Sequence, residues 1–177
     1  SLGFDIGSSS VKASLLDCAT GQVLAQGFSP STELPISSPQ PGWAEQDPAT
    51  WWSHSVILSH RLLKEAGVDA ASVGAIGISY QMHGLVLVDE QHEVLRPAII
   101  WCDSRAVETG RKAFESIGSE FCLSHLLNSP GNFTASKLAW VVTALLVAGA
   151  GGLSPATPVF AIVVLALGAA AAWLQGK

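Results

Sequence analysis

The chain has 177 residues and a formal net charge of −5. That length is enough for one ordinary domain with a hydrophobic core. The acidic balance and the lack of any basic cluster exclude nucleic acid as an expected partner. The three cysteines, Cys18, Cys102 and Cys122, have no metal-ligand spacing, so we expect incidental thiols in a reduced, cytoplasmic protein. No signal peptide is expected, because Asp5 interrupts the first apolar run.

The charged side chains are distributed unevenly along the chain. Lys177 is the only charged residue after Lys137. We therefore expect a soluble domain over residues 1–141 and an uncharged apolar tail over residues 142–177.

Three short apolar runs open the chain, at residues 2–6, 11–17 and 22–28, separated by the turns GSSS and CATG. Such tight spacing predicts a meander of antiparallel strands. Residues 29–46 are rich in Pro and Ser, which predicts a loop without regular structure.

Residues 47–67 predict a long helix. Asp47 suits the N-cap, Pro48 the first helical position and Gly67 the left-handed C-terminal position. Its apolar residues recur at helical spacing and predict one buried face, made of Trp51, Trp52, Val56, Leu58, Leu62 and Leu63.

The following segments alternate between strand and helix patterns. Residues 73–81 are almost continuously apolar, which predicts a buried strand, and residues 85–97 predict a hairpin with the turn DEQH. Residues 103–118 predict a second capped helix that ends at Gly118. The whole pattern predicts a mixed α/β sheet covered by helices.

The first turn, in the stretch FDIGSSSVK, suggests a binding role. Gly and Ser at a hairpin tip offer backbone N–H groups and hydroxyls to an anion. Asp5 precedes the turn and would repel a bare phosphate, so it fits only if a divalent cation lies between them. Two interpretations stay open at this point: a clamp for a nucleoside triphosphate, different from the Walker type, or a plain turn of small residues.

Five stretches taken together have a specific resemblance. They are GFDIGSSSVK, SPQPGWAEQDPATWW, GISYQMHGLVLVD, LRPAIIWCDSRA and PGNFTASKLAWV, in this order between residues 2 and 141. In this order they resemble the motifs of the FGGY family of carbohydrate kinases, and within it the xylulokinases most of all. The resemblance implies an actin-like ATPase fold, in which two ribonuclease-H-like domains enclose the active site, with only the N-terminal domain represented here.

The resemblance also implies roles for individual residues. The hairpin that binds the ATP phosphates matches Gly7, Ser8, Ser9 and Lys12, and Asp5 is expected near the γ-phosphate and the Mg²⁺ that accompanies it. The sugar-binding motifs match Met82, His83, Asp103 and Arg105. His83 could instead be an ordinary turn residue, and Asp103 could cap the following helix with Arg105 as a solvated charge. Trp43, Trp51, Trp52 and Trp101 are interpreted as core or pocket walls.

The chain also departs from the family pattern. The family's catalytic base is an Asp in a downstream Gly-Asp pair, whereas the last acidic residue here is Glu120. The domain that holds the adenosine site has no counterpart. The resemblance thus implies phosphoryl transfer from ATP to D-xylulose or a related ketose or polyol, and a chain that is inactive by itself. The alternative is a membrane-associated, non-catalytic binding or structural subunit, and the oligomeric state, a homodimer included, stays open.

The apolar tail allows three interpretations. Residues 159–174 carry no charge, but this run is shorter than the ~20 residues that usually span a bilayer. The tail could be a membrane hairpin or anchor, a foreign sequence joined to a kinase fragment, or a buried helix pair. In each case we expect the tail to be removed from water. Of the possible outcomes, we expect that the tail draws the chain into detergent or membranes.

Overall fold

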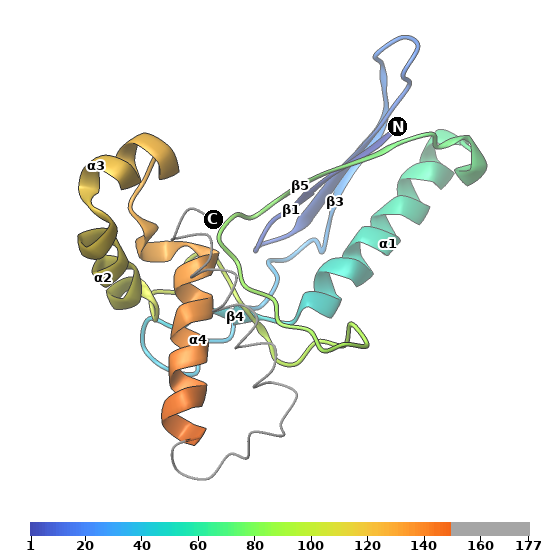
Figure 1. Cartoon of the computed structure of the whole chain (residues 1–177). Coiled ribbons are helices and arrows are strands. Elements are labelled where there is room, and N and C mark those ends of the chain that lie inside the picture. Colours follow the sequence, from blue (N-terminus) through green and yellow to red (C-terminus); the bar gives the residue numbers. More distant parts are fainter. Residues whose placement is uncertain (150–177) are drawn as a thin grey trace.

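The computed structural model describes residues 1–149, which form a sheet with one long helix against it and a smaller group of helices beside them (Figure 1). The sheet has the strand order β3-β2-β1-β5. Its strands are β1 (Leu2–Ile6), β2 (Val11–Leu16), β3 (Val23–Ser29) and β5 (Ile76–Tyr80). β2 pairs antiparallel with both β1 and β3, which confirms the predicted meander, and β5 pairs parallel with β1.

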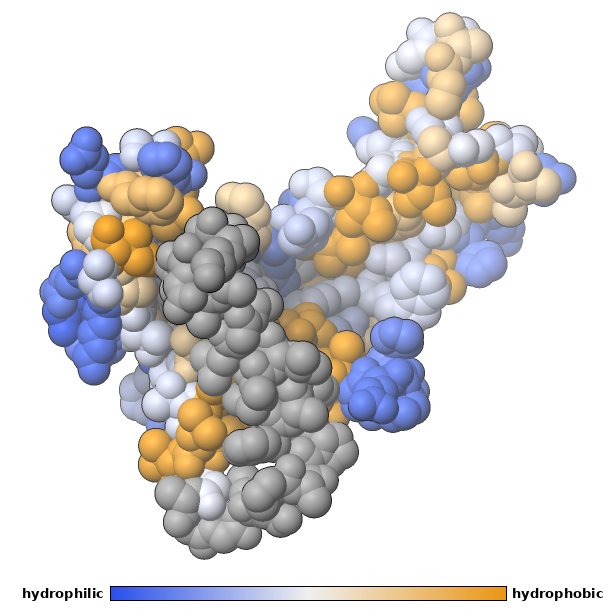
Figure 2. All heavy atoms as spheres, in the orientation of Figure 1, coloured by the Kyte–Doolittle hydropathy of each residue, from blue (hydrophilic) through white to orange (hydrophobic). Residues whose placement is uncertain are grey.

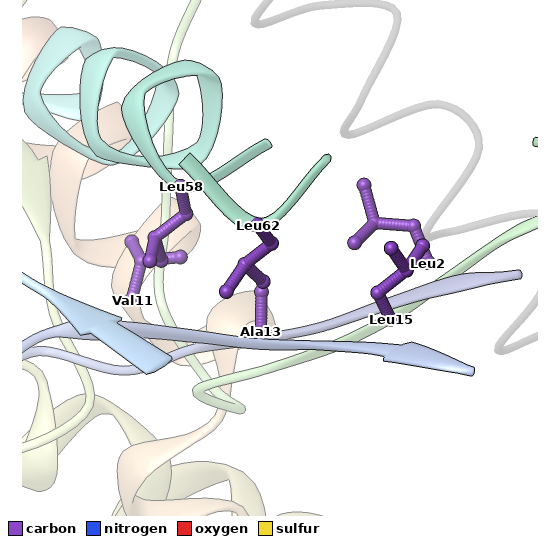
Figure 3. Packing of buried hydrophobic residues seen from close by; sticks show 6 residues of the cluster. All are labelled: Leu2, Val11, Ala13, Leu15, Leu58 and Leu62. Atoms are coloured by element: carbon purple, nitrogen blue, oxygen red, sulfur yellow. The ribbon is translucent and has the colours of Figure 1, made fainter. Parts of the chain in front are cut away.

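Helix α1 (Pro48–Ala66) covers one face of this sheet. Every second residue of β2 faces the helix, and Leu58 and Leu62 are spaced one turn apart on α1, so the two apolar rows meet. Figure 3 shows Leu58 and Leu62 directed at Val11 and Ala13. The buried cluster consists of Leu2, Val11, Ala13, Leu15, Leu58 and Leu62.

The predicted ends of α1 are confirmed. The Asp47 carboxylate accepts from the N–H of Ala49 at 2.9 Å, and Gly67 adopts a left-handed conformation with φ 63°. The predicted buried face is wrong at Trp52, which is 72% exposed. Trp51 instead packs against Ala44, Ala98 and Ile100, because neighbouring helical positions point in different directions.

β5 is a strand, as predicted, but the expectation that it is buried is wrong for the described residues. All five of its residues are exposed, among them Ile76, Ile78 and Tyr80. β5 lies at the edge of the sheet, and within residues 1–149 α1 packs over the other strands. The surface in this region is rich in apolar side chains (Figure 2).

The second group of elements is built around a short antiparallel pair of strands, β4 (Glu45–Gln46) and β6 (Ala98–Ile99). The predicted hairpin is present as a bridge between Val88 and Val94, with its turn at residues 89–92. The remaining elements are η1 (Ala70–Ser72), α2 (Val107–Ile117), α3 (Ser119–Phe121), η2 (Cys122–Leu126), η3 (Pro130–Asn132) and α4 (Thr134–Gly149).

The second helix ends at Gly118 as predicted, but it begins at Val107, four residues after Asp103. Its N-cap position is Ala106, and no side chain caps it. The alternative interpretation of Asp103 as the cap of this helix is therefore wrong, because its carboxylate is bound to other partners.

Helix α4 runs through the point at which the sequence predicts the boundary between domain and tail. Val141 and Val142 are buried, and Val141 packs with Leu85 and Ile99. Apolar residues directly after position 141 thus belong to the packed domain. Within residues 1–149 no helix is both long and apolar enough to cross a membrane. Residues 150–177, and with them most of the predicted tail, lie outside the described part.

Gly110 marks the closest approach between α2 and η3. A Cβ at this position would lie 2.4 Å from Gly131 Cα and 2.5 Å from the Pro130 carbonyl oxygen. We expect Gly110→Ala to lower the free energy of unfolding by about 1–3 kcal/mol, because backbone atoms must move apart to admit the methyl group. The better helix propensity of Ala offsets only about 1 kcal/mol. Urea unfolding followed by Trp fluorescence measures the change.

Gly77→Ala is the matched control, since a Cβ at Gly77 meets nothing within 4 Å. An unfolding midpoint for Gly110→Ala equal to that of Gly77→Ala would contradict the close packing.

Candidate functional site

Two of the sequence motifs meet at one edge of the sheet. Ile6 and Tyr80 are paired at the carboxyl ends of the parallel strands β1 and β5. The Gly-Ser hairpin follows β1 directly, and the turn of residues 81–84 follows β5. The N–H of Gln81 donates to the carbonyl of Ile6 at 2.9 Å, which fixes the two segments side by side. Carboxyl ends of parallel strands are where open α/β sheets bind ligands.

Three hydrogen bonds from other segments of the chain hold the hairpin between β1 and β2 in place. The carbonyl of Ser8 accepts from Gln46 Nε2 at 2.6 Å, and Ser8 Oγ accepts from Trp101 Nε1 at 3.1 Å. The carbonyl of Ser9 accepts from the N–H of Leu34 at 2.8 Å. Among residues 1–149, no hydrogen bond uses the N–H of Ser8, Ser9 or Ser10. The hairpin therefore presents a fixed backbone with unused donors, which suits an anion.

Gly7 closes the hairpin. Its N–H donates to the carbonyl of Ser10 at 3.1 Å, and a Cβ here would lie only 3.2 Å from that carbonyl oxygen. A larger residue would therefore push against the turn.

Asp5 and Lys12 lie opposite each other on β1 and β2. Lys12 Nζ is 3.3 Å from Asp5 Oδ2, and both side chains are more than half exposed. Exposed pairs of this kind are weak and exchange partners readily. Within the described residues no group of three or more His, Cys, Asp or Glu side chains could hold a metal ion. Asp5 is thus a single accessible carboxylate beside the hairpin.

The turn after β5 has an uncommon backbone. His83 adopts a left-handed conformation with φ 65°, and its ring stacks on Phe133 at a centroid distance of 4.9 Å. The carbonyl of His83 accepts from Lys137 Nζ at 2.9 Å, and that of Gly84 accepts from Thr134 Oγ1 at 3.1 Å. Met82 is 67% exposed. The start of α4 thus supports the turn, while Met82 faces solvent.

Asp103 and Arg105 lie at the centre of a buried ionic network. Asp103 accepts from the N–H of Ala44 at 2.6 Å and from Arg105 Nη2 at 2.7 Å. Arg105 Nη2 also lies 2.7 Å from Glu45, which pairs with Arg96 as well. The side chains of Asp103 and Arg105 are 0% and 1% exposed. Both residues are therefore engaged by the protein, except for Arg105 Nη1, which has no partner among residues 1–149.

The same network fixes the pKa of Asp103. Burial opposes the charged carboxylate, but the hydrogen bonds from Arg105 and Ala44 outweigh it and hold the pKa of Asp103 below its ordinary value of 3.8. Burial lowers the pKa of Lys137, and the Asp103 carboxylate nearby opposes that shift.

Two aromatic side chains, Trp43 and Trp140, line the network beside Arg105, as predicted for Trp43. The guanidinium of Arg105 lies 3.7 Å from the centre of the Trp43 ring, which meets Trp140 edge to face. Trp101 is half exposed, and its carbonyl accepts from Asn132 Nδ2.

The sequence interpretation missed four residues of this region: Gln46, Gln81, Asn132 and Lys137. Gln81 has a buried side-chain amide without a hydrogen-bond partner among residues 1–149. Gln81 directly precedes the predicted pair Met82 and His83, so its place in the same motif could have identified it as a site residue. The other three act through contacts between distant segments, which no local pattern reveals.

Comparisons with known proteins agree with this geometry. Residues 1–145 match the model of the FGGY family of carbohydrate kinases, N-terminal domain. The chain is 39% identical over 142 residues to a xylulose kinase of Klebsiella pneumoniae, covering 79% of this chain and 28% of that protein. It is 34% identical over 145 residues to a xylulose kinase of Bacillus subtilis, covering 79% and 27%.

Solved structures give the same result. A xylulose kinase from Rhodospirillum rubrum superposes with a TM-score of 0.67 at 30% identity, covering 79% of this chain and 28% of that one. A kinase from Brucella ovis superposes with a TM-score of 0.66 at 36% identity, covering 80% and 29%.

The chain thus spans little more than a quarter of the length of the relatives it matches. The predicted α/β fold of the actin-like ATPase type, represented by part of the N-terminal domain, is confirmed by these neighbours. The family match covers most of the chain, and the hairpin and the turn that the motifs single out lie together at one edge of the sheet. This chain belongs to the FGGY family of carbohydrate kinases.

Proposed function

We propose that this chain forms the N-terminal part of an ATP-dependent kinase that phosphorylates D-xylulose or a related ketose or polyol. The observation that carries the proposal is the link between the Gly-Ser hairpin and the sugar motifs. Trp101, two residues before Asp103, donates to Ser8 of the hairpin, and Gln81, next to Met82, donates to the strand that leads into it. Phosphate donor and sugar acceptor must meet within a few ångströms for transfer, and this edge of the sheet joins the two motifs.

On the phosphate side, we assign the hairpin residues Gly7, Ser8 and Ser9 to the ATP phosphates. Their support is the set of unused N–H groups on a backbone that Gln46, Trp101 and Leu34 hold in place. Lys12 is assigned to a phosphate oxygen, since its weak pair with Asp5 can open.

Asp5 fits the Mg²⁺ that ATP carries. Mg²⁺ in proteins keeps several waters and uses one or two carboxylates together with phosphate oxygens, and Asp5 is a single exposed carboxylate beside the hairpin. The ion would supply positive charge to the transferring phosphoryl group.

On the sugar side, we assign Met82 and His83 to direct contact. Met82 is exposed, and the imidazole of His83 can exchange hydrogen bonds with a hydroxyl group. Asp103 and Arg105 are assigned to the wall of the same site, where they hold Trp43 and Ala44. Within residues 1–149, Arg105 Nη1 is a donor of this pair without a partner, and we assign it to a sugar hydroxyl.

Met82 provides the test, because it is the only methionine of the chain. A chain that starts at Ser1 and carries ¹³C-methyl methionine gives one methyl signal, which we expect to shift and saturate as D-xylulose is added. Affinity should be low, because an open half-site buries little of the sugar. His83→Ala should weaken the response.

His60→Ala, an exposed histidine of α1, is the matched control and should behave like the unaltered chain. A signal that does not move with D-xylulose, or that moves equally in His83→Ala, would count against the proposed sugar site.

A further inference from the structure

Lys137 is an uncommon residue to find inside a protein. It lies in the first turn of α4 and is 0% exposed. Burial of an ammonium group costs several kcal/mol unless hydrogen bonds replace its water. No carboxylate of residues 1–149 forms a salt bridge with it. A methionine of similar length would fill the same space without that cost, so packing alone does not account for a lysine.

The ammonium group is matched by three oxygen acceptors. Lys137 Nζ donates to the carbonyl of His83 at 2.9 Å, to the carbonyl of Asn132 at 2.8 Å and to Asn132 Oδ1 at 2.7 Å. Only the protonated form has three N–H donors, and each has a partner here. The site is therefore built for the charged side chain.

One of these bonds holds the turn of residues 81–84, called the sugar turn below because it carries Met82 and His83 of the proposed sugar site. His83 is held in the left-handed region with φ 65°, where a residue with a side chain is strained. Neighbouring contacts must hold such a backbone in place, and the Lys137 bond to the His83 carbonyl is one of them. The stack of His83 on Phe133, directly before α4, is the second.

The other two bonds act on the Trp101 segment. Because Asn132 Oδ1 accepts from Lys137, its amide nitrogen faces the Trp101 carbonyl, to which it donates. Trp101 in turn donates to Ser8 of the hairpin. Lys137 thus contacts the sugar turn directly and is connected to the Gly-Ser hairpin by hydrogen bonds through Asn132 and Trp101.

We infer that Lys137 is a positioning residue of the sugar site, which acts through His83 and Asn132 rather than by contact with the sugar. The inference rests on the proposed function for its ligand and on these hydrogen bonds for its geometry. Loss of the ammonium group leaves three acceptors unpaired and releases the His83 turn, so the sugar must then reorder that turn on binding. Ordering costs of this kind weaken affinity roughly tenfold.

The test compares Lys137→Met with two controls. Lys112→Met removes an exposed ammonium group on α2, and Leu58→Ala removes stability through the core beneath the sheet, away from α4. The first readout is the pair of His83 imidazole signals, which carry a ring-current shift from the stacked Phe133. The second is the apparent affinity for D-xylulose, at a temperature where every variant is folded. It is followed at the Met82 methyl group, whose signal the unaltered chain and Leu58→Ala identify beside that of the added methionine in the other two variants.

We expect Lys137→Met to move the His83 signals and to weaken the apparent affinity roughly tenfold. Both controls should leave both readouts unchanged, although Leu58→Ala lowers stability. If Lys137→Met resembles Lys112→Met in both readouts, or if Leu58→Ala reproduces its effects, Lys137 has no positioning role.

Two further outcomes are also decisive. If the unaltered chain does not respond to D-xylulose, the proposed function fails, and the His83 signals alone still decide whether Lys137 holds the turn. If circular dichroism shows that Lys137→Met is unfolded, Asn132→Ala replaces it, since it removes one of the three acceptors and the bond to Trp101. A smaller change in the same direction supports the inference, and no change overturns it.

Discussion

The purified chain, supplied with Mg²⁺, ATP and D-xylulose, should release ADP no faster with the sugar than without it. A kinase of this type needs a carboxylate that takes the proton of the attacking hydroxyl as a general base, which contributes typically 10²–10⁴-fold to the rate. Glu120 is the last acidic residue of the chain. Asp5 lies beside the Gly-Ser hairpin and pairs with Lys12, and Asp103 is buried against Arg105. In the proposed arrangement Asp5 serves the Mg²⁺ and the phosphates, and Asp103 is bound to Arg105, so neither is placed to act as that base.

Positioning is the larger loss. Holding two substrates in the reactive geometry can lower the activation barrier by ~7–11 kcal/mol. This chain spans little more than a quarter of the length of its relatives, so most of the residues that position substrates in them have no counterpart in it. We therefore expect a loss of several orders of magnitude in turnover. A full-length xylulose kinase from Escherichia coli, which the chain matches at 39% identity, serves as the positive control in a coupled ADP assay. Sugar-dependent turnover clearly above the ATPase background would contradict the prediction.

The elements that the sequence predicts correctly are those fixed by local chemistry. The turns GSSS and CATG allow only short connections, so the meander of β1, β2 and β3 follows from spacing. Asp47, Pro48 and Gly67 each satisfy a backbone requirement within a few residues of themselves, and α1 begins and ends with them.

The wrong predictions depend on contacts between distant segments. β5 looks buried because it is apolar, yet its burial depends on what covers the sheet edge, and residues 1–149 leave it exposed. Asp103 looks like a helix cap because a helix pattern follows it. Its carboxylate instead binds the N–H of Ala44, 59 positions away.

In the candidate site, too, local motifs could be predicted from the sequence, whereas contacts between distant segments could not. Its motifs could be found because hairpin and turn residues are contiguous in the sequence. Lys137, Asn132 and Gln46 could not, because each acts on a segment that only the folded chain brings near. In the sequence, Lys137 looks like the last charged residue before a long apolar stretch, and only the folded chain shows that it is buried among three acceptors.

Asp103→Asn should lower the free energy of unfolding at neutral pH by about 3 kcal/mol, the lower end of what breaking a buried ion pair costs. The Asp103 carboxylate accepts from Arg105 Nε and Nη2 and from the N–H groups of Ala44 and Arg105. Asparagine removes one charge from this set and presents an N–H₂ group to donors. Glu45 still neutralises part of the guanidinium charge, which keeps the loss from the upper end of the range.

Glu108→Gln gives the matched comparison, since Glu108 pairs with Arg111 on the surface of α2 with both side chains more than half exposed. Screening by water makes such pairs weak, so its unfolding midpoint in urea should stay close to that of the unaltered chain. Equal midpoints for Asp103→Asn and Glu108→Gln would show that the buried network contributes no more than a surface pair.

The pH dependence of the Asp103→Asn effect gives an independent check on its cause. The pKa of Asp103 in the folded chain lies below its ordinary value of 3.8, so folding favours the charged carboxylate. The stability from this group is complete above about pH 3.8 and is lost as the pH falls below that value through the folded pKa. The gap between the unaltered chain and Asp103→Asn should therefore be equal at pH 7 and pH 5 and should narrow below pH 3.8. A gap that widens in acid would mean that Asp103 is stabilised in its protonated form, which is incompatible with a carboxylate that only accepts hydrogen bonds from Arg105 and two backbone N–H groups.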